Sequence, residues 1–175
     1  VEVFGRIDVL VNAAGVVTGG NVESASVEDW QIAMDTNAKS VFLMCRLAMP
    51  YLRSTKGAIV NVASTVAIKG VKNRAIYSAT KGAVLALSRS IAAEYVADGI
   101  RVNCVCPGTV YSPSFQRRVD AAEDPELAMK QFVERQPMGR LGTAEEVAKA
   151  IVFAAGEGVE FMTGANIVVD GGMTV

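Results

Sequence analysis

Apolar runs of strand length alternate along the chain with longer segments whose apolar positions recur at helical spacing. The strand-like runs occupy residues 7–13, 58–62, 100–105 and 166–169. Continuous apolar runs are typical of strands buried on both faces, and their alternation with helices is typical of βαβ units. The pattern therefore predicts an α/β fold with helices packed on a parallel sheet.

The two longest helical segments carry recognisable start and stop signals. One is predicted over residues 27–53, where Ser26 and Asp29 have the spacing of a capping box. The other is predicted over residues 75–98, and Gly99 is the residue that commonly ends a helix. Both helices lie between consecutive strands, as crossover connections of a parallel sheet do.

The region after the third strand is more polar. Residues 114–122 and 125–136 form two weakly amphipathic helical pieces that resemble a lid more than a core element. Thr143 and Glu146 then form a capping box that opens an Ala-rich helix to about Ala155. Because no repeat or linker interrupts the pattern, residues 1–175 are predicted to form a single domain.

Composition narrows the class of protein. Hydrophobic residues make up 51% of the chain, which is enough for a sizeable core. The 17 Lys and Arg residues nearly cancel the 18 Asp and Glu residues, so neither a nucleic acid nor an anionic membrane is indicated as a partner. No apolar run is long enough for a membrane span, and the first residues lack the pattern of a signal peptide. We expect a cytoplasmic protein.

The chain has no histidine and three cysteines. The missing histidine excludes Ser-His-Asp hydrolysis and HExxH zinc sites, so proton transfer must come from Tyr, Lys, Asp, Glu or Cys. Cys45, Cys104 and Cys106 lie in apolar runs, which indicates reduced thiols rather than a disulfide framework. We expect the side chains of Cys104 and Cys106 on opposite faces of the third strand, and no metal site.

Tyr77 and Lys81 are four residues apart in a predicted helix, so their side chains share one face. A neighbouring ammonium group favours the phenolate and lowers the pKa of a tyrosine. The pair is therefore a candidate general acid/base. The alternative is an apolar contact beside a solvated charge.

Further polar or small residues lie where parallel strands end. Residues 12–15 end the first strand, Ser64 follows the second, and residues 107–110 end the third. The carboxyl ends of parallel strands are where such sheets bind ligands. Asn37 lies within a predicted helix, where asparagine is unfavourable and indicates a specific role. Together these positions outline a site.

A glycine-rich phosphate-binding turn between a strand and a helix is not found. The nearest candidate, Gly15 with Gly19 and Gly20, is too loosely spaced and too far before its helix. The sequence therefore lacks the phosphate-binding turn that a dinucleotide-binding sheet needs.

Taken together, these motifs resemble the short-chain dehydrogenase/reductase family over the whole chain, with Ala13 and Ser112 as mild departures. The matching positions are Asn12-Ala13-Ala14-Gly15, Asn37, Ser64, Tyr77-x-x-x-Lys81, Pro107-Gly108-Thr109-Val110, Thr163-Gly164 and Asp170-Gly171-Gly172. The resemblance implies a Rossmann-like doubly wound sheet of which this chain holds the carboxyl-terminal four strands and their helices. The family's phosphate loop and the residue that selects NAD or NADP would precede Val1, so the chain is interpreted as a truncated domain.

The resemblance also implies roles. Tyr77 would be the general acid/base, Ser64 would bond the substrate oxygen, Lys81 would lower the tyrosine pKa and hold the nicotinamide ribose, and Asn37 would order a water. The implied cofactor contacts are Asn12, Ala13, Ala14, Gly15, Tyr77, Lys81, Pro107, Gly108, Val110, Ser112, Pro113 and Ser114.

Residues 103–110, Pro113-Ser114 and residues 134–140 are similar to the family branch of cytosolic 3-hydroxybutyrate and 2-keto-3-deoxy-sugar-acid dehydrogenases. This likeness implies oxidation of a small hydroxy acid with NAD, although NADP remains open, and a carboxylate held by Arg74, Arg118 and Arg135. The alternative is three solvated surface arginines.

Two other functions stay open. One is a 3-oxoacyl-thioester reductase, which would need no carboxylate clamp, and the other is a non-catalytic remnant. The family resemblance implies a homo-oligomer, tetramer or dimer, formed through the two long helices. We also expect a partner to cover the edge strand at residues 7–13, because unpaired strand edges are otherwise left to water.

Overall fold

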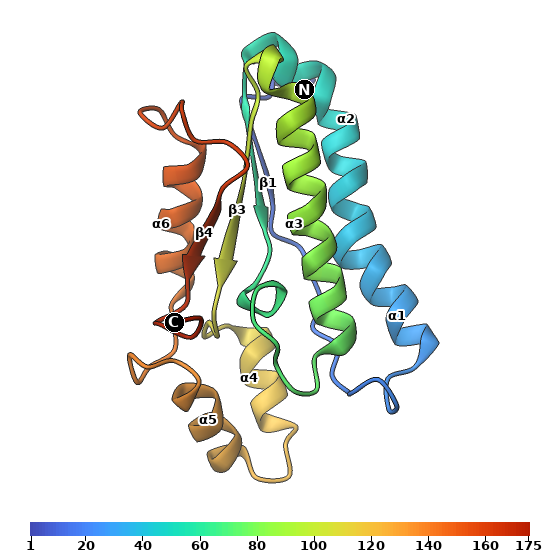
Figure 1. Cartoon of the computed structure of the whole chain (residues 1–175), viewed down its shortest axis with the longest axis vertical. Coiled ribbons are helices and arrows are strands. Elements are labelled where there is room, and N and C mark those ends of the chain that lie inside the picture. Colours follow the sequence, from blue (N-terminus) through green and yellow to red (C-terminus); the bar gives the residue numbers. More distant parts are fainter.

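The computed structural model describes residues 1–175 and contains one parallel sheet. Its strands follow the chain in the order β1-β2-β3-β4, and each connection crosses over through helical segments (Figure 1). Their bounds are Val9–Asn12, Ala58–Val62, Arg101–Pro107 and Asn166–Val169. The predicted α/β fold is confirmed, although β1 is shorter at both ends and β3 runs two residues further than the sequence indicated.

Helices cover both faces of the sheet (Figure 1). The helices α1 (Val27–Met34), α2 (Ser40–Thr55) and α3 (Ala75–Tyr95) lie on one face, and α6 (Ala144–Ala155) lies on the other. The short helices α4 (Pro113–Asp120) and α5 (Pro125–Glu134) lie beyond the carboxyl ends of the strands. This arrangement leaves the strand ends and the α4–α5 segment facing each other.

The predicted single helix over residues 27–53 is interrupted. A π-helical turn at Asp35–Lys39 separates α1 from α2, and Asn37 in this turn is fully buried. The Asn37 amide accepts a hydrogen bond from the Val16 nitrogen (2.7 Å) and donates one to the Val16 oxygen (2.9 Å). Widened turns of this kind occur often at functional sites, and here the turn ties the loop after β1 to the helix.

The larger core lies between the sheet and the helices α2 and α3, and it includes Leu52, Ile59 and Val102. Cys104 and Cys106 both belong to this core, so our expectation that they face opposite sides of the strand is wrong. Residues two apart in a strand point to the same face. Burial raises the pKa of the Cys106 thiol to about 12. Both thiols are therefore neutral packing groups.

Some apolar surface is left uncovered. β1 pairs with β2 alone, and its Val9 and Val11 side chains are 42% and 43% exposed. Leu43, Leu47 and Tyr51, four residues apart on α2, are also exposed. Partner chains at these surfaces stay a prediction. None of the helices combines the length and apolar character needed to cross a membrane.

Candidate active site

Ser64, Tyr77 and Lys81 line one cavity of about 360 Å³ at the carboxyl ends of the strands. Ser64 begins the short helical turn after β2, while Tyr77 and Lys81 lie in the first two turns of α3. Ser64 and Tyr77 also line a smaller adjoining cavity of about 90 Å³. The structure thus brings together three of the four predicted catalytic residues, each from its expected element.

The Tyr77 hydroxyl is held as a neutral phenol. Burial raises the pKa of Tyr77 above its usual value, and the neighbouring Ser64 side chain and the charges of Arg118 and Arg74 oppose this only in part. The expected lowering by Lys81 is not seen. The Lys81 nitrogen lies 5.8 Å from the centre of the Tyr77 ring, and burial lowers the pKa of Lys81 to about 8.

Backbone and side-chain bonds fix the groups behind the tyrosine. The buried Lys81 ammonium donates to the Val62 oxygen (2.8 Å), which leaves two of its three N–H groups free. The Asn37 amide donates to the Thr80 hydroxyl (3.0 Å), which in turn donates to the Tyr77 carbonyl (2.8 Å). Asn37 therefore lies behind the cavity and contacts the helix turn that carries Tyr77.

Gly15 packs closely against the side chains of Asn37 and Lys81. A Cβ atom at this position would lie 3.1 Å from the Asn37 oxygen and 3.5 Å from the Lys81 nitrogen. Even an alanine here would crowd the Asn37 side chain, while its contact with Lys81 would be an ordinary one.

Most of the predicted cofactor contacts line the larger cavity. Besides Tyr77 and Lys81, these are Ala13, Gly15, Pro107, Gly108, Val110, Ser112 and Ser114. Asn12, Ala14 and Pro113 do not line it. The Asn12 amide instead donates to Asn61 (2.8 Å) on the neighbouring strand, and it also contacts the Cys45 sulfur (3.6 Å), because its side chain lies on the sheet face that α2 covers. Pro113 begins α4, whose N-cap is the Ser112 side chain.

The three predicted substrate arginines meet in the smaller cavity. Arg74, Arg118 and Arg135 line it together with Ser64 and Tyr77, and each is partly buried. None of them forms an ion pair with an acidic residue. Burial is the main cause lowering the pKa of Arg118 and Arg135, and the neighbouring arginines lower it further. The Arg118 Nε atom is buried without a hydrogen-bond partner. This cavity gathers positive charge with no protein anion to balance it.

Two phenylalanines support the arginines, and the sequence reasoning missed them. The Arg135 guanidinium lies 4.5 Å from the centre of the Phe132 ring, and that of Arg118 lies 5.8 Å from the Phe115 ring. The two rings meet edge to face at 5.0 Å. Each phenylalanine precedes its arginine by three residues, a spacing that places both on one helix face. That spacing was the available signal.

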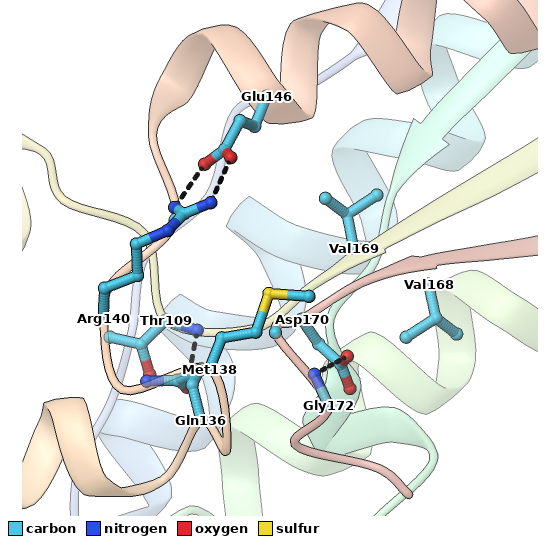
Figure 2. A pocket seen from close by; sticks show the side chains of 11 residues that line it. Thr109, Gln136, Met138, Arg140, Glu146, Val168, Val169, Asp170 and Gly172 are labelled. Carbon is cyan, nitrogen blue, oxygen red and sulfur yellow. Dashed lines mark hydrogen bonds and ion pairs between the residues drawn. The ribbon is translucent and has the colours of Figure 1, made fainter.

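A third cavity, of about 330 Å³, lies beside the end of β4 (Figure 2). On its wall, the Arg140 guanidinium donates two hydrogen bonds to the Glu146 carboxylate, at 2.9 and 2.6 Å. Asp170 accepts from the Gly172 nitrogen (2.9 Å), and Gln136 accepts from the Thr109 nitrogen (3.3 Å). The charged groups of this cavity already have protein partners. Their hydrogen bonds stabilise the surrounding turns and leave no free charge for a ligand.

Comparisons with known proteins identify the family. A family model described as enoyl-(acyl carrier protein) reductase matches residues 1–174. Dehydrogenase/reductase SDR family member 6 of Rattus norvegicus is 45% identical over 172 residues, which cover 97% of this chain and 70% of the relative. The chain belongs to the short-chain dehydrogenase/reductase family.

Two further members of the family are informative. The 2-keto-3-deoxy-L-fuconate dehydrogenase of Xanthomonas campestris is 41% identical, with 98% of this chain and 58% of the relative covered. The solved structure of ElxO with NADP bound has a TM-score of 0.91 and 33% identity, covering 98% of this chain and 69% of ElxO. The Rossmann-like sheet of the family is therefore shared along nearly the whole chain.

Proposed function

We propose that the protein transfers a hydride between a nicotinamide cofactor and a small hydroxy acid or keto acid. The observation that carries this proposal is the cavity in which Arg74, Arg118 and Arg135 lie unpaired beside Ser64 and Tyr77. Arginine binds carboxylates bidentately, so an acid substrate would place its carboxylate there and its carbinol near the tyrosine.

The larger cavity fits the nicotinamide end of the cofactor. Lys81 has free N–H donors at its wall, and small residues such as Ala13 and Gly15 let a ring or ribose approach the backbone. The bound cofactor would supply the hydride chemistry. NAD is our proposal for its identity, and NADP is the alternative, since ElxO was solved with NADP.

The roles of the side chains follow from their positions. Tyr77, neutral in this structure, donates its proton to the substrate oxygen during reduction and becomes a phenolate; in the oxidation direction that phenolate takes the proton back from the carbinol. Ser64 donates a hydrogen bond to the developing alkoxide. Lys81 holds the cofactor ribose, and Asn37 supports the α3 turn from behind.

The test compares a hydroxy acid with its methyl ester as substrates. A carboxylate clamp predicts that the acid is turned over far more efficiently, because the ester lacks the charge that the arginines bind. Equal turnover of acid and ester would contradict the carboxylate clamp and favour the 3-oxoacyl-thioester reductase. Absence of turnover with either substrate and either cofactor would favour the non-catalytic alternative.

Cofactor binding by the 175-residue chain alone gives an independent test. The glycines between β1 and α1, Gly15, Gly19 and Gly20, are too loosely spaced and too far before α1 for the usual pyrophosphate-binding turn. We therefore expect NAD affinity weaker than micromolar in calorimetry with this chain. Micromolar binding would contradict this and require another phosphate site.

We also propose that the protein is a cytoplasmic homo-oligomer. The exposed Leu43, Leu47 and Tyr51 on α2 and the unpaired edge of β1 are the surfaces that a second copy would cover. A stable monomer of 18.4 kDa in gel filtration would contradict the oligomer.

A further inference from the structure

A second cation-lined cavity adjoins the arginine cavity. It has a volume of about 350 Å³ and is lined by Lys69, Gly70, Val71, Lys72, Arg135 and Met173. Val71, Arg135 and Met173 line both cavities, so the two spaces meet at these residues. The inner cavity, at about 90 Å³, has room for only a few substrate atoms beyond the carboxylate. A longer substrate would extend into the outer one.

Charge in the outer cavity is as unbalanced as in the inner one. Three of its six lining residues are cationic, and none is acidic. Neither Lys69, Lys72 nor Arg135 takes part in any ion pair. Across both cavities, five cationic side chains therefore line one continuous space without a carboxylate on its wall.

The rim of the outer cavity is anchored. The Lys69 ammonium donates to the Met173 carbonyl (2.6 Å), which joins the loop after β2 to the end of the chain. The Thr65 hydroxyl contacts the Met173 sulfur (3.5 Å) from the same loop. Lys72, by contrast, makes no side-chain hydrogen bond and is exposed. Its ammonium is the group with the most freedom to meet a ligand.

From this arrangement we propose that the cavity of Lys69, Lys72 and Arg135 is a second anion subsite. The substrate is then a hydroxy acid that carries another anionic group, such as a carboxylate, at its far end. One carboxylate occupies the Arg74 and Arg118 side of the inner cavity, and the second anionic group reaches Lys72. This inference rests on the proposed function and narrows its substrate class from acids to dianions.

The experiment measures dissociation constants by NMR titration for unbranched dicarboxylates from malonate to adipate, and for monocarboxylates of the same lengths. We expect one dicarboxylate length to bind about fivefold more tightly than its monocarboxylate, which is the upper range for an exposed charge contact. A shallow rise in affinity over all dicarboxylates alike would reflect general charge attraction and would overturn the subsite.

Single substitutions test whether Lys72 causes the dicarboxylate preference. Lys72→Gln should abolish the preference for the best dicarboxylate, measured as the ratio of the two dissociation constants. Lys149→Gln, which removes an exposed charge on α6 that lines neither cavity, is the matched control and should leave that ratio unchanged. An unchanged ratio in Lys72→Gln would also overturn the proposal.

The two levels of inference fail differently. If monocarboxylates bind and Arg118→Ala weakens them, but no dicarboxylate binds better, the second subsite is wrong and the carboxylate clamp stands. If no carboxylate binds, or if binding is insensitive to Arg118→Ala, the proposed function itself fails.

Adding inorganic phosphate to a monocarboxylate titration separates a linked second group from a free anion. Tighter monocarboxylate binding with phosphate, and no dicarboxylate preference, would assign the subsite to a free anion and overturn the proposal.

Discussion

The two walls of the substrate cavity are built in different ways. One wall, called here the sheet wall, is formed by the turn after β2 with Ser64 and by the start of α3 with Tyr77 and Lys81. Lys81 is only 4% exposed and donates to the backbone of β2. The opposite wall carries Arg118 and Arg135 on the short helices α4 and α5, where the guanidinium groups stack on phenylalanine rings. The groups proposed for chemistry thus lie on α3 and the turn after β2, both packed on the sheet. Two of the three arginines proposed for recognition lie on a separate two-helix segment, and the third, Arg74, is the N-cap of α3.

This difference has a physical consequence. A buried side chain with fixed backbone partners keeps its position whatever the ligand, as proton transfer requires. A segment outside the main core can be altered without disturbing the sheet. Changes on the sheet wall should therefore affect turnover of every substrate, and changes on the α4–α5 wall should affect the choice among substrates.

The largest effect is expected for Tyr77→Phe. This change keeps the ring but removes the hydroxyl that would exchange the substrate proton, and general acid/base catalysis typically contributes roughly 10²- to 10⁴-fold. We expect kcat to fall about 10³-fold for acid and ester alike. Steady-state rates, with circular dichroism to check the fold, provide the measurement.

Tyr95→Phe is the control on the same helix. Tyr95 ends α3, and its ring lies 5.1 Å from the Arg53 guanidinium, away from both cavities. Its variant should keep normal rates. Comparable losses in the two variants would show that the effect comes from α3 stability rather than from proton transfer.

The second prediction concerns Lys81 and the dependence of stability on pH. Burial lowers the pKa of Lys81 to about 8, below the value of about 10.5 in an unfolded chain. Between these values the unfolded state binds more protons at Lys81, so this group makes the free energy of unfolding rise with pH. The buried thiols, whose pKa values are raised, contribute with the opposite sign over the same range. The buried charge costs up to about 3 kcal/mol below pH 8, and this cost disappears above about pH 10.5.

The measurement is the free energy of unfolding in urea at several pH values across that window. Lys81→Met should make the slope between about pH 8 and 10.5 less positive than that of the wild type, and the exposed Lys149→Met should leave the slope unchanged. Only the slope is diagnostic, because Lys81→Met also leaves the Val62 oxygen without its donor. A slope that survives in Lys81→Met would contradict the buried-charge interpretation.

The sheet wall was largely predictable from the sequence. Strand ends are recognisable from apolar runs, and Ser64, Tyr77 and Lys81 lie at fixed spacings from them. The π-helical turn at Asp35–Lys39 was not predictable, since the apolar spacing of residues 27–53 suits an uninterrupted helix. The raised pKa of Tyr77 was missed because sequence spacing reveals a neighbouring charge but not the depth of burial.

The third prediction tests the opposite wall through Arg118. A charge-assisted contact to a carboxylate contributes roughly 1.5 to 3 kcal/mol, so Arg118→Ala should lower kcat/KM for the acid about 10- to 150-fold. The methyl ester should be little affected. The neighbouring Arg117 is exposed and outside the cavity, so Arg117→Ala is the matched control. A similar loss for acid and ester would argue against a carboxylate contact.

The α4–α5 wall was harder to predict in detail. The arginines were identified by resemblance, but their convergence depends on how α4 packs on α5, which no local pattern records. The contact between Phe115 and Phe132 that fixes this packing joins residues 17 positions apart by their numbers, on different helices. A tertiary contact of this kind is visible only in the structure.

The smallest effect is expected for Phe132→Leu. This change keeps an apolar side chain but removes the ring beneath Arg135 and the edge-to-face contact with Phe115. An exposed cation–π contact contributes roughly 0.5 to 1 kcal/mol, so KM for the acid should rise about 2- to 5-fold with kcat unchanged. Phe153→Leu, at an exposed position on α6, is the control and should change neither value. A fall in kcat for acid and ester alike would show that Phe132 supports the sheet wall as well, and the division between the two walls would then be wrong.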